Sequence, residues 1–331
     1  MNKILKILIG VASIIIILAG IKAASDIIGF ILIAVLLAIS ITPIVIFLTK
    51  KGLKRKTALF IVILSLLIIG SVLIQQLGSS IYELSRTLPS YELRMQEIII
   101  STDNFLERYN LDVDKIIEQF EIDTKVIFQF AASLLSRMGN YIGSGIFLLI
   151  ILSLMVIEFS GYESSFKAGN IKRVSFSAKL YDIRTEVRKY LSITALTGFI
   201  AAVCNLILLL VLGVDFPFLW AALSFFLNFI PVLGVLIYTL LPCLMALLQF
   251  GWTEALIVAI GFTIFNNVAD NIIKPKLLKD GLKISLLMIF LSLYFWNWVL
   301  GFSGAILAIP LTIVFKRIIS ELSKDKNILD I

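Results

Sequence analysis

The chain has 331 residues, of which 60% are hydrophobic and 15% are charged, with a formal net charge of +7 and a mean hydropathy of +1.03. This composition excludes an ordinary soluble domain, and because the basic residues lie between apolar stretches, the positive charge does not indicate nucleic-acid binding. The sequence contains no histidine, which excludes histidine-based catalysis and the usual zinc sites. We therefore expect a membrane protein with no metal, no cofactor and no enzymatic activity.

Apolar stretches of about 20 residues, long enough to cross a bilayer as a helix, recur along the chain. They fall at 4–22, 27–48, 57–77, 141–160, 191–213 and 253–273. Two further regions are typical of pairs of shorter helices, 217–230 with 232–249 and 284–300 with 303–319. The first arm has only 14 residues, too few to cross, so we expect re-entrant or broken-helix hairpins. The predicted fold is an all-α polytopic transmembrane bundle of about eight membrane segments.

The N-terminal part divides into two segments of different character. Residues 1–77 hold transmembrane helices; Lys3 and Lys6 before the first apolar stretch also resemble a secretory signal, but we expect this stretch to be retained as a helix. Residues 78–140 contain ten acidic and six basic residues, with apolar positions at helical spacing. We expect an extracytoplasmic segment of two or three amphipathic helices, which either binds a partner or another subunit, or packs on the bundle as a linker.

Basic residues set the expected topology. Residues 141–190 combine a transmembrane helix with a basic cytoplasmic stretch, 191–320 form a C-terminal transmembrane core with broken helices, and 321–331 form a cytoplasmic tail. Of the 29 basic residues, 22 lie in groups that can all face the cytoplasm if both hairpins return to the side they left. Both termini are therefore predicted to be cytoplasmic, with the bilayer as the surrounding partner.

Helix-breaking residues interrupt the apolar region 191–273, which has three charged residues among 83. Pro231 lacks an amide donor, so we expect carbonyl groups around Leu227 and Asn228 to be without helical partners at membrane depth. Such groups can face a solute or an ion, as in the broken helices of secondary transporters. Gly234 permits a tight turn or a close backbone approach. The alternative is that these residues only shape hairpins.

A polar cluster follows near the end of the same region. Three residues spaced by four share one helix face: Asn267, Asn271 and Pro275. Asn266 and Asp270 lie on an adjoining stripe. A carboxylate at Asp270 could bind a cation or exchange a proton, or it could simply pair with Lys274 four residues later.

These considerations give two sets of candidate residues. The predicted solute or ion pathway comprises Asn228, Pro231, Gly234, Asn266, Asn267, Asp270 and Asn271. The predicted hinges and turns are Pro242, Pro275, Gly301, Gly304 and Pro310.

The C-terminal third carries a series of short motifs. They are FFLNFIPVLG at 225–234, LP at 241–242, QFG at 249–251, NNVADNIIKP at 266–275, LSLYFW at 291–296, LGFSG at 300–304 and AIPL at 308–311. Together they resemble the autoinducer-2 exporter family of bacterial membrane proteins, the AI-2E transporters. The resemblance is close over 216–320, and the upstream layout is similar. Lys274 departs from the family pattern, which has an acidic residue before the proline.

This resemblance implies export of a small polar solute, with autoinducer-2 as one candidate, by a multi-pass protein of the bacterial cytoplasmic membrane. Some members of the family are linked instead to sodium or lithium exchange against protons, so a monovalent cation or proton is an alternative cargo. Lys274 weakens the expectation of proton coupling. A third alternative is an oligomeric scaffold or sensor, and a homo-oligomer is compatible with each of the three. The sequence contains no P-loop motif, so ATP-driven transport by this chain is not indicated.

Overall fold

The computed structural model describes residues 3–107, 133, 145–167, 175–231, 233–278 and 285–326, and in these residues the regular structure is entirely helical. Among these described residues, six helices are long and apolar enough to cross a membrane, and three shorter apolar helices accompany them. The six are Ser25–Lys50, Arg55–Thr87, Ile183–Leu212, Leu233–Phe250, Trp252–Leu277 and Leu287–Ile318. The prediction of a polytopic helical membrane protein is confirmed.

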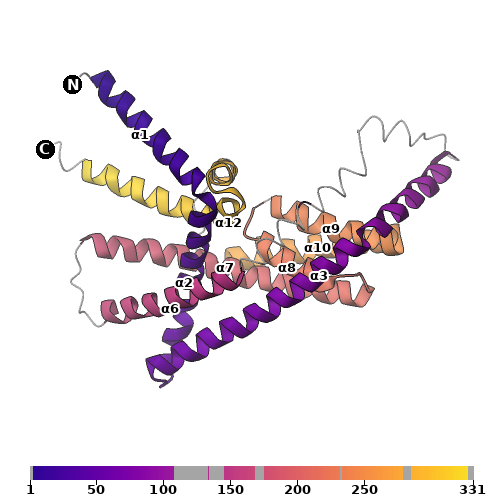
Figure 1. The fold of residues 1–331 in the computed structure, drawn as a ribbon, viewed down its shortest axis with the longest axis horizontal. Helices are drawn as coiled ribbons and strands as arrows, with labels where there is room; N and C mark the ends of the chain where they lie inside the picture. The colour runs from indigo at the N-terminus through magenta and orange to yellow at the C-terminus, as the bar shows by residue number, and fades with distance from the viewer. Residues whose placement is uncertain are drawn as a thin grey trace.

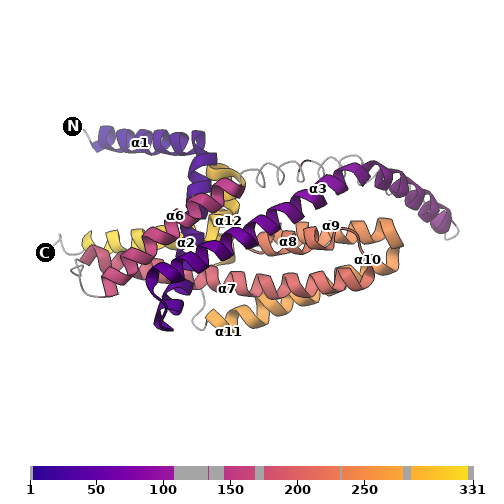
Figure 2. The same cartoon turned by 60° about the horizontal axis from the view of Figure 1, so that its bottom comes forward.

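The N-terminal helices α1 (Lys3–Ala23) and α2 (Ser25–Lys50) precede α3 (Arg55–Glu107), a single helix of 53 residues. Figures 1 and 2 show α3 passing diagonally along the bundle and extending beyond the ends of α9 and α10. α3 continues past residue 77, where we expected the transmembrane segment to end. The apolar positions after residue 77 keep the helical period of the span, so the helix is not interrupted. The other helices expected in 78–140 lie outside the described residues.

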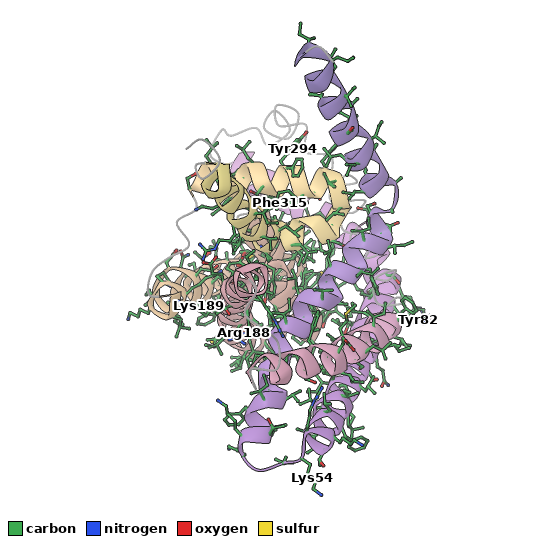
Figure 3. The ribbon with its side chains drawn as sticks, turned by 90° about the vertical axis from the view of Figure 1, so that its left-hand side faces the viewer. Lys54, Tyr82, Arg188, Lys189, Tyr294 and Phe315 are labelled. Carbon is green, nitrogen blue, oxygen red and sulfur yellow. The ribbon has the colours of Figure 1, made fainter. Side chains whose placement is uncertain are left out.

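The next two helices, α6 (Gly145–Lys167) and α7 (Ser175–Leu212), lead into the C-terminal core. There α8 (Pro217–Leu227) packs between α7 and α9 (Leu233–Phe250), and α9 packs against α10 (Trp252–Asn267). The largest fully buried side chains of this core include Tyr238, Phe262, Leu209, Leu219 and Leu248. Outside the core the apolar surface is open: Tyr82 and Tyr294 stand on the surface in Figure 3, and 60% and 78% of them is exposed, as expected for side chains facing lipid.

Among the described residues of this C-terminal region, two helix breaks stand out. The first separates α8 from α9, close to the boundary between the predicted arms 217–230 and 232–249. The second lies inside α12 (Leu286–Lys326), where Gly301 has φ 62° and ψ −147°. A left-handed φ of this kind favours glycine, and it ends the first arm at the position where the sequence predicts a turn.

The two arms of α12 fold back on each other. Trp296 Nε1 donates a hydrogen bond of 3.3 Å to Thr312 Oγ1, and the Trp296 ring centroid lies 5.2 Å from that of Phe315. In an uninterrupted helix, residues 296 and 312 would be about 24 Å apart. The first described turn of α1 and the last turns of α12 lie at the same side of the molecule in both views (Figures 1 and 2).

Candidate functional site

The interface between α7 and α8 contains a buried polar contact at the end of α8. Asn228, 8% exposed, follows the last residue of α8 and donates from Nδ2 to the carbonyl oxygen of Thr194 on α7 at 3.3 Å. Gly198 lies beside it, since a Cβ there would be 2.7 Å from Asn228 Nδ2. The missing side chain at Gly198 therefore makes room for the Asn228 amide.

A second polar pair lies further along the same interface. Asn205 is fully buried, and its Nδ2 donates to Ser224 Oγ at 3.3 Å, while Ser224 Oγ donates to the carbonyl oxygen of Ala221 at 2.8 Å. Thr194, Gly198 and Asn205 recur on α7 at the spacing that places residues on one helix face. The polar face of α7 thus follows α8 through an otherwise apolar region.

Some buried polar atoms in this core have no hydrogen-bond partner among the described residues. They include Oδ1 of Asn205 and the hydroxyl of Tyr238 on α9, and both residues are fully buried. An unsatisfied buried polar group costs about 1–3 kcal/mol, so native structures keep few of them, often at functional sites. These two atoms are therefore candidates for contact with a polar cargo.

The break between α8 and α9 is a tight turn. The amide of Ile230 donates to the carbonyl of Leu227 at 2.9 Å, and the amide of Gly234 donates to the carbonyl of Ile230 at 3.1 Å. The expectation that the Leu227 carbonyl is unpartnered is wrong, because the chain tightens into a shorter-range hydrogen bond before Pro231. A Cβ at Gly234 would overlap the Leu227 carbonyl oxygen, so this glycine permits a close backbone approach.

The asparagine cluster lies where α10 passes into a π-helical turn, η1 (Val268–Ile273). Asn266 is buried and donates to the Phe262 carbonyl at 2.6 Å. Asn267 and Asn271 are exposed and are joined by a 2.8 Å bond from Asn271 Nδ2 to Asn267 Oδ1. The structure therefore separates the cluster, with one asparagine toward the core and two on the outside. Single π-turns inside α-helices are frequent at functional sites.

Asp270 is paired. Lys274 Nζ lies 3.1 Å from Asp270 Oδ1, and their side chains are 19% and 29% exposed, respectively. The pairing was the alternative reading of the four-residue spacing, and the structure forms it. The Asp270 carboxylate therefore faces Lys274, on the next turn of the same helical segment.

The predicted hinge residues fall into two groups. Gly301 forms a turn, and a Cβ at Gly304 would overlap the Trp296 carbonyl oxygen. In contrast, Pro242 lies inside α9 and Pro310 inside α12, so neither proline forms a turn, and a hinge at either position stays a prediction. A proline removes only one amide donor, and packing against neighbouring helices lets such a helix continue. Pro275 lies within α11 (Lys274–Leu278) and is exposed.

Sequence reasoning missed four of the residues that the structure brings together: Thr194, Asn205, Ser224 and Tyr238. Their signal was available in part, since Thr194 and Asn205 are polar residues inside the predicted span 191–213. Polar residues in such spans usually face the protein interior. The pairing of Asn205 with Ser224 depends on how α7 and α8 pack, which the spacing of residues along one helix does not fix.

Comparison with known proteins agrees with this architecture. The family model for AI-2E family transporters matches residues 11–324. The AI-2 transport protein TqsA of Escherichia coli K12 is 30% identical over 324 residues, covering 98% of this chain and 94% of TqsA. A putative transport protein of Haemophilus influenzae is 30% identical over 321 residues, covering 93% and 90%. The putative transport protein YhhT of Escherichia coli K12 is 30% identical over 312 residues, covering 94% and 89%. The chain belongs to the AI-2E family of transporters.

Proposed function

We propose that this protein exports a small polar solute by alternating access, along a pathway formed by the polar face of α7, the end of α8 and the turn that follows it. The proposal is carried by two buried polar atoms in the helical core, Asn205 Oδ1 and the Tyr238 hydroxyl, which have no hydrogen-bond partner among the described residues. Autoinducer-2 is the first candidate solute, because the relative TqsA is described as an AI-2 transport protein.

Burying polar groups within the membrane costs free energy. Polar groups at membrane depth are expensive, so they persist where they face a cavity, a partner or a cargo. Asn228 stands at the junction of α8 and the break, and its amide bond to the Thr194 carbonyl joins α8 to α7. A rocking motion of α8 and α9 against α7 would break and remake this contact, as alternating access requires.

A second candidate function, exchange of sodium or lithium against protons, is favoured by Asp270. Asp270 lies in the π-helical turn η1, and its carboxylate pairs with Lys274. An antiporter would need that carboxylate to exchange Lys274 for a cation or a proton during transport. The ion pair opposes this exchange, so we place solute export first.

We further propose that the protein lies in the bacterial cytoplasmic membrane with both termini in the cytoplasm. The positions of the first turn of α1 and the last turns of α12 at the same side of the molecule support this orientation (Figures 1 and 2). The basic residues at the turn between α2 and α3, which includes Lys54 (Figure 3), agree with a cytoplasmic position under the positive-inside rule. A homo-oligomer is compatible with this arrangement.

Transport into inverted membrane vesicles tests the proposal. Vesicles from cells that express the protein should accumulate autoinducer-2, and Asn228→Ala should reduce the rate about tenfold if one buried hydrogen bond of about 1.4 kcal/mol is needed in the cycle. Ser65→Ala on α3, an exposed serine bonded only to its own helix, is the matched control. In parallel, proteoliposomes with an internal pH dye and a sodium or lithium gradient test the antiporter. A pH change abolished by Asp270→Asn, without solute uptake, would support the antiporter and contradict the exporter.

A further inference from the structure

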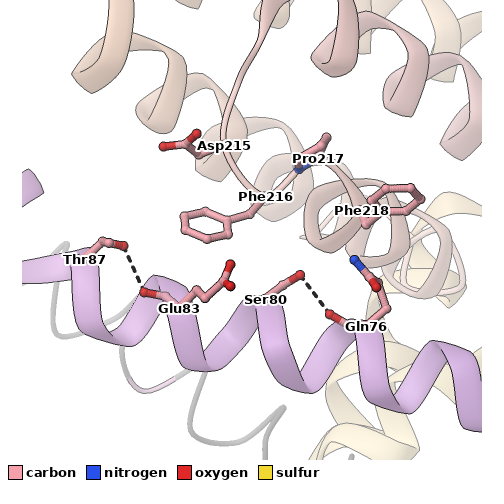
Figure 4. A pocket seen from close by; sticks show the side chains of 8 residues that line it. All are labelled: Gln76, Ser80, Glu83, Thr87, Asp215, Phe216, Pro217 and Phe218. Carbon is pink, nitrogen blue, oxygen red and sulfur yellow. Dashed lines mark hydrogen bonds between the residues drawn. The ribbon is translucent and has the colours of Figure 1, made fainter.

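A cavity of about 400 Å³ separates the middle of α3 from the turn that joins α7 to α8. Side chains from α3 form one wall and residues of the turn and the start of α8 form the other, as Figure 4 shows. The lining includes Gln76, Ser80, Glu83, Asp215, Phe216 and Phe218. None of the residues that line this cavity belongs to the α7–α8 polar interface of the proposed pathway.

Two carboxylates face this cavity from opposite walls, Glu83 on α3 and Asp215 on the turn (Figure 4). Within the described part of the chain, neither forms an ion pair with a lysine or an arginine. Arg86, three residues after Glu83, places its guanidinium 5.7 Å from the centre of the Tyr82 ring. Asp215 Oδ2 accepts a hydrogen bond of 2.6 Å from the Tyr91 hydroxyl. Within the described residues the cavity therefore has two carboxylates with no ion-pair partner, and of the two only that of Asp215 accepts a hydrogen bond from a side chain.

The hydroxyls of the α3 wall leave acceptor positions free. Ser80 Oγ donates to the Gln76 carbonyl at 2.8 Å, and Thr87 Oγ1 donates to the Glu83 carbonyl at 3.1 Å. Because each hydroxyl proton is used within the helix, the oxygen lone pairs are what these groups can offer to a ligand. Together with the carboxylates, they suit a ligand that donates several hydrogen bonds.

Aromatic faces complete the lining. The Phe216 ring lies between the Glu83 and Asp215 side chains in Figure 4, and the backbone of Phe216 has a φ of 58°, an unusual value for a residue other than glycine. Phe218 is 47% exposed on the same wall. Aromatic faces attract cations through the ring quadrupole, so the aromatic and acidic groups favour the same sign of charge.

We propose that this cavity binds a primary ammonium group. An ammonium offers three N–H donors and one positive charge, which match two carboxylates, hydroxyl acceptors and aromatic faces. Anionic ligands would be repelled by Glu83 and Asp215. A divalent metal is a poorer fit, because no group of three or more acidic, cysteine or histidine side chains that could hold one exists among the described residues.

The position of the cavity allows two sources for the ammonium. Glu83 lies near the end of the apolar stretch Arg55–Thr87, and Asp215 follows the end of the stretch Ile183–Leu212. The site therefore lies at the level where two spans leave the membrane. An ethanolamine headgroup of a lipid and a free amine in solution both present this chemistry there, and the test separates them. The proposal does not depend on which cargo the protein transports.

The test uses the purified full-length protein. Ethylammonium is titrated into the protein in a detergent without amines, with binding followed by calorimetry and ethanol as the neutral control. Native mass spectrometry then measures how much phosphatidylethanolamine, against phosphatidylglycerol, stays bound after extraction from mixed nanodiscs. Glu83→Gln is the test variant, and Glu97→Gln, an exposed acidic residue on α3 outside the cavity, is its matched control.

Each outcome decides the proposal. Ethylammonium binding that weakens about tenfold in Glu83→Gln but not in Glu97→Gln supports a site for a free amine, because hydrogen bonds to charged groups are among the strongest. Retention of phosphatidylethanolamine that is lost only in Glu83→Gln, without ethylammonium binding, supports a headgroup site. If neither probe binds, or if Glu83→Gln and the wild type bind both equally, the proposal is overturned. Glu83 is exposed on a helix surface, so its replacement should leave the fold intact, and circular dichroism checks this.

Discussion

The hydroxyl of Tyr91 donates a hydrogen bond of 2.6 Å to Asp215 Oδ2, joining two residues 124 positions apart in the sequence. Gln249 closes the network: its Nε2 donates to the Tyr91 hydroxyl at 3.1 Å, and its Oε1 accepts from the Asp215 amide at 3.0 Å. Trp220 Nε1 donates to the Asp215 carbonyl at 2.9 Å. These bonds connect α3, beyond its apolar span, to the turn after α7 and to the end of α9.

This network predicts that Tyr91→Phe loosens α3. The variant loses the donor to Asp215 and the acceptor for Gln249, which should lower the free energy of unfolding by about 1–2 kcal/mol. Thermal unfolding of the detergent-solubilised protein measures the change. Tyr82→Phe on the same helix, whose ring is 60% exposed, is the control and should unfold like the wild type. An unchanged midpoint for Tyr91→Phe would show that the network contributes nothing to stability.

The same tyrosine predicts a dependence on alkaline pH. Burial, followed by the hydrogen bond to Asp215, raises the pKa of Tyr91 from its ordinary value of 10 to about 12. The unfolded chain therefore releases this proton first, so the contribution of Tyr91 to stability is constant below pH 10 and falls as the pH rises toward about 12. Unfolding midpoints measured between pH 8 and pH 11.5 should decline more steeply for the wild type than for Tyr91→Phe. Parallel curves would contradict the raised pKa.

The glycines after the two helix breaks predict severe steric effects. A Cβ at Gly234 would overlap the Leu227 carbonyl oxygen, and one at Gly304 would overlap the Trp296 carbonyl oxygen. Backbone cannot move away as a side chain can, so Gly234→Ala and Gly304→Ala should each destabilise the protein by about 2 kcal/mol or more. Gly78→Ala on α3, where nothing lies within 4 Å of the new methyl group, should be neutral or stabilising. Yields of folded protein and thermal midpoints distinguish these cases.

Replacing Tyr238 should change the transport rate without lowering stability. Because its buried hydroxyl has no partner among the described residues, Tyr238→Phe should leave the unfolding midpoint unchanged or raise it. If the hydroxyl contacts the solute during export, the same variant should reduce the transport rate about tenfold. A variant that is destabilised and retains full transport would show that the hydroxyl has a structural role instead.

Variants at Gly198 and at Asn228 should have the same effect, because both disrupt the same contact between α7 and α8. Gly198→Ala places a methyl group 2.7 Å from Asn228 Nδ2, which should displace the amide from the Thr194 carbonyl. The transport rate of Gly198→Ala should therefore resemble that of Asn228→Ala, and the double variant should be no slower than either single variant. Additive losses in the vesicle assay would mean that the two residues act separately.

The sequence predicts the fold well where composition decides it. Apolar length defines the spans, and proline or glycine marks both breaks, so the arms around Pro231 and Gly301 were predictable. The continuous length of α3 was not predictable. In the sequence, an amphipathic helix that follows a transmembrane span looks like a separate element even where no helix-breaking residue separates the two. Pro242 and Pro310, which we expected as hinges or turns, lie inside α9 and α12, because neighbouring helices support a helix that contains a proline.

The candidate site was predictable only in part. Asn228, Gly234 and Asp270 lie near the break and the π-turn, where helix-breaking and polar residues drew attention to them. The roles of Asn205 and Tyr238 depend on tertiary packing, since each becomes a buried polar group only once α7, α8 and α9 assemble. The four-residue spacing of Asp270 and Lys274 was compatible with either a free carboxylate or an ion pair. Only the three-dimensional structure distinguishes the two.

We propose that the polar interface of α7 and α8 conducts a small polar solute outward. The most direct measurement is the initial rate of autoinducer-2 accumulation in inverted vesicles, compared among the wild type, Asn228→Ala and Ser65→Ala at equal expression. We predict rapid accumulation by the wild type and by Ser65→Ala, and about a tenfold slower rate for Asn228→Ala. Equal rates for all three proteins would contradict the assigned pathway, and accumulation no faster than in vesicles lacking the protein would contradict export of this solute.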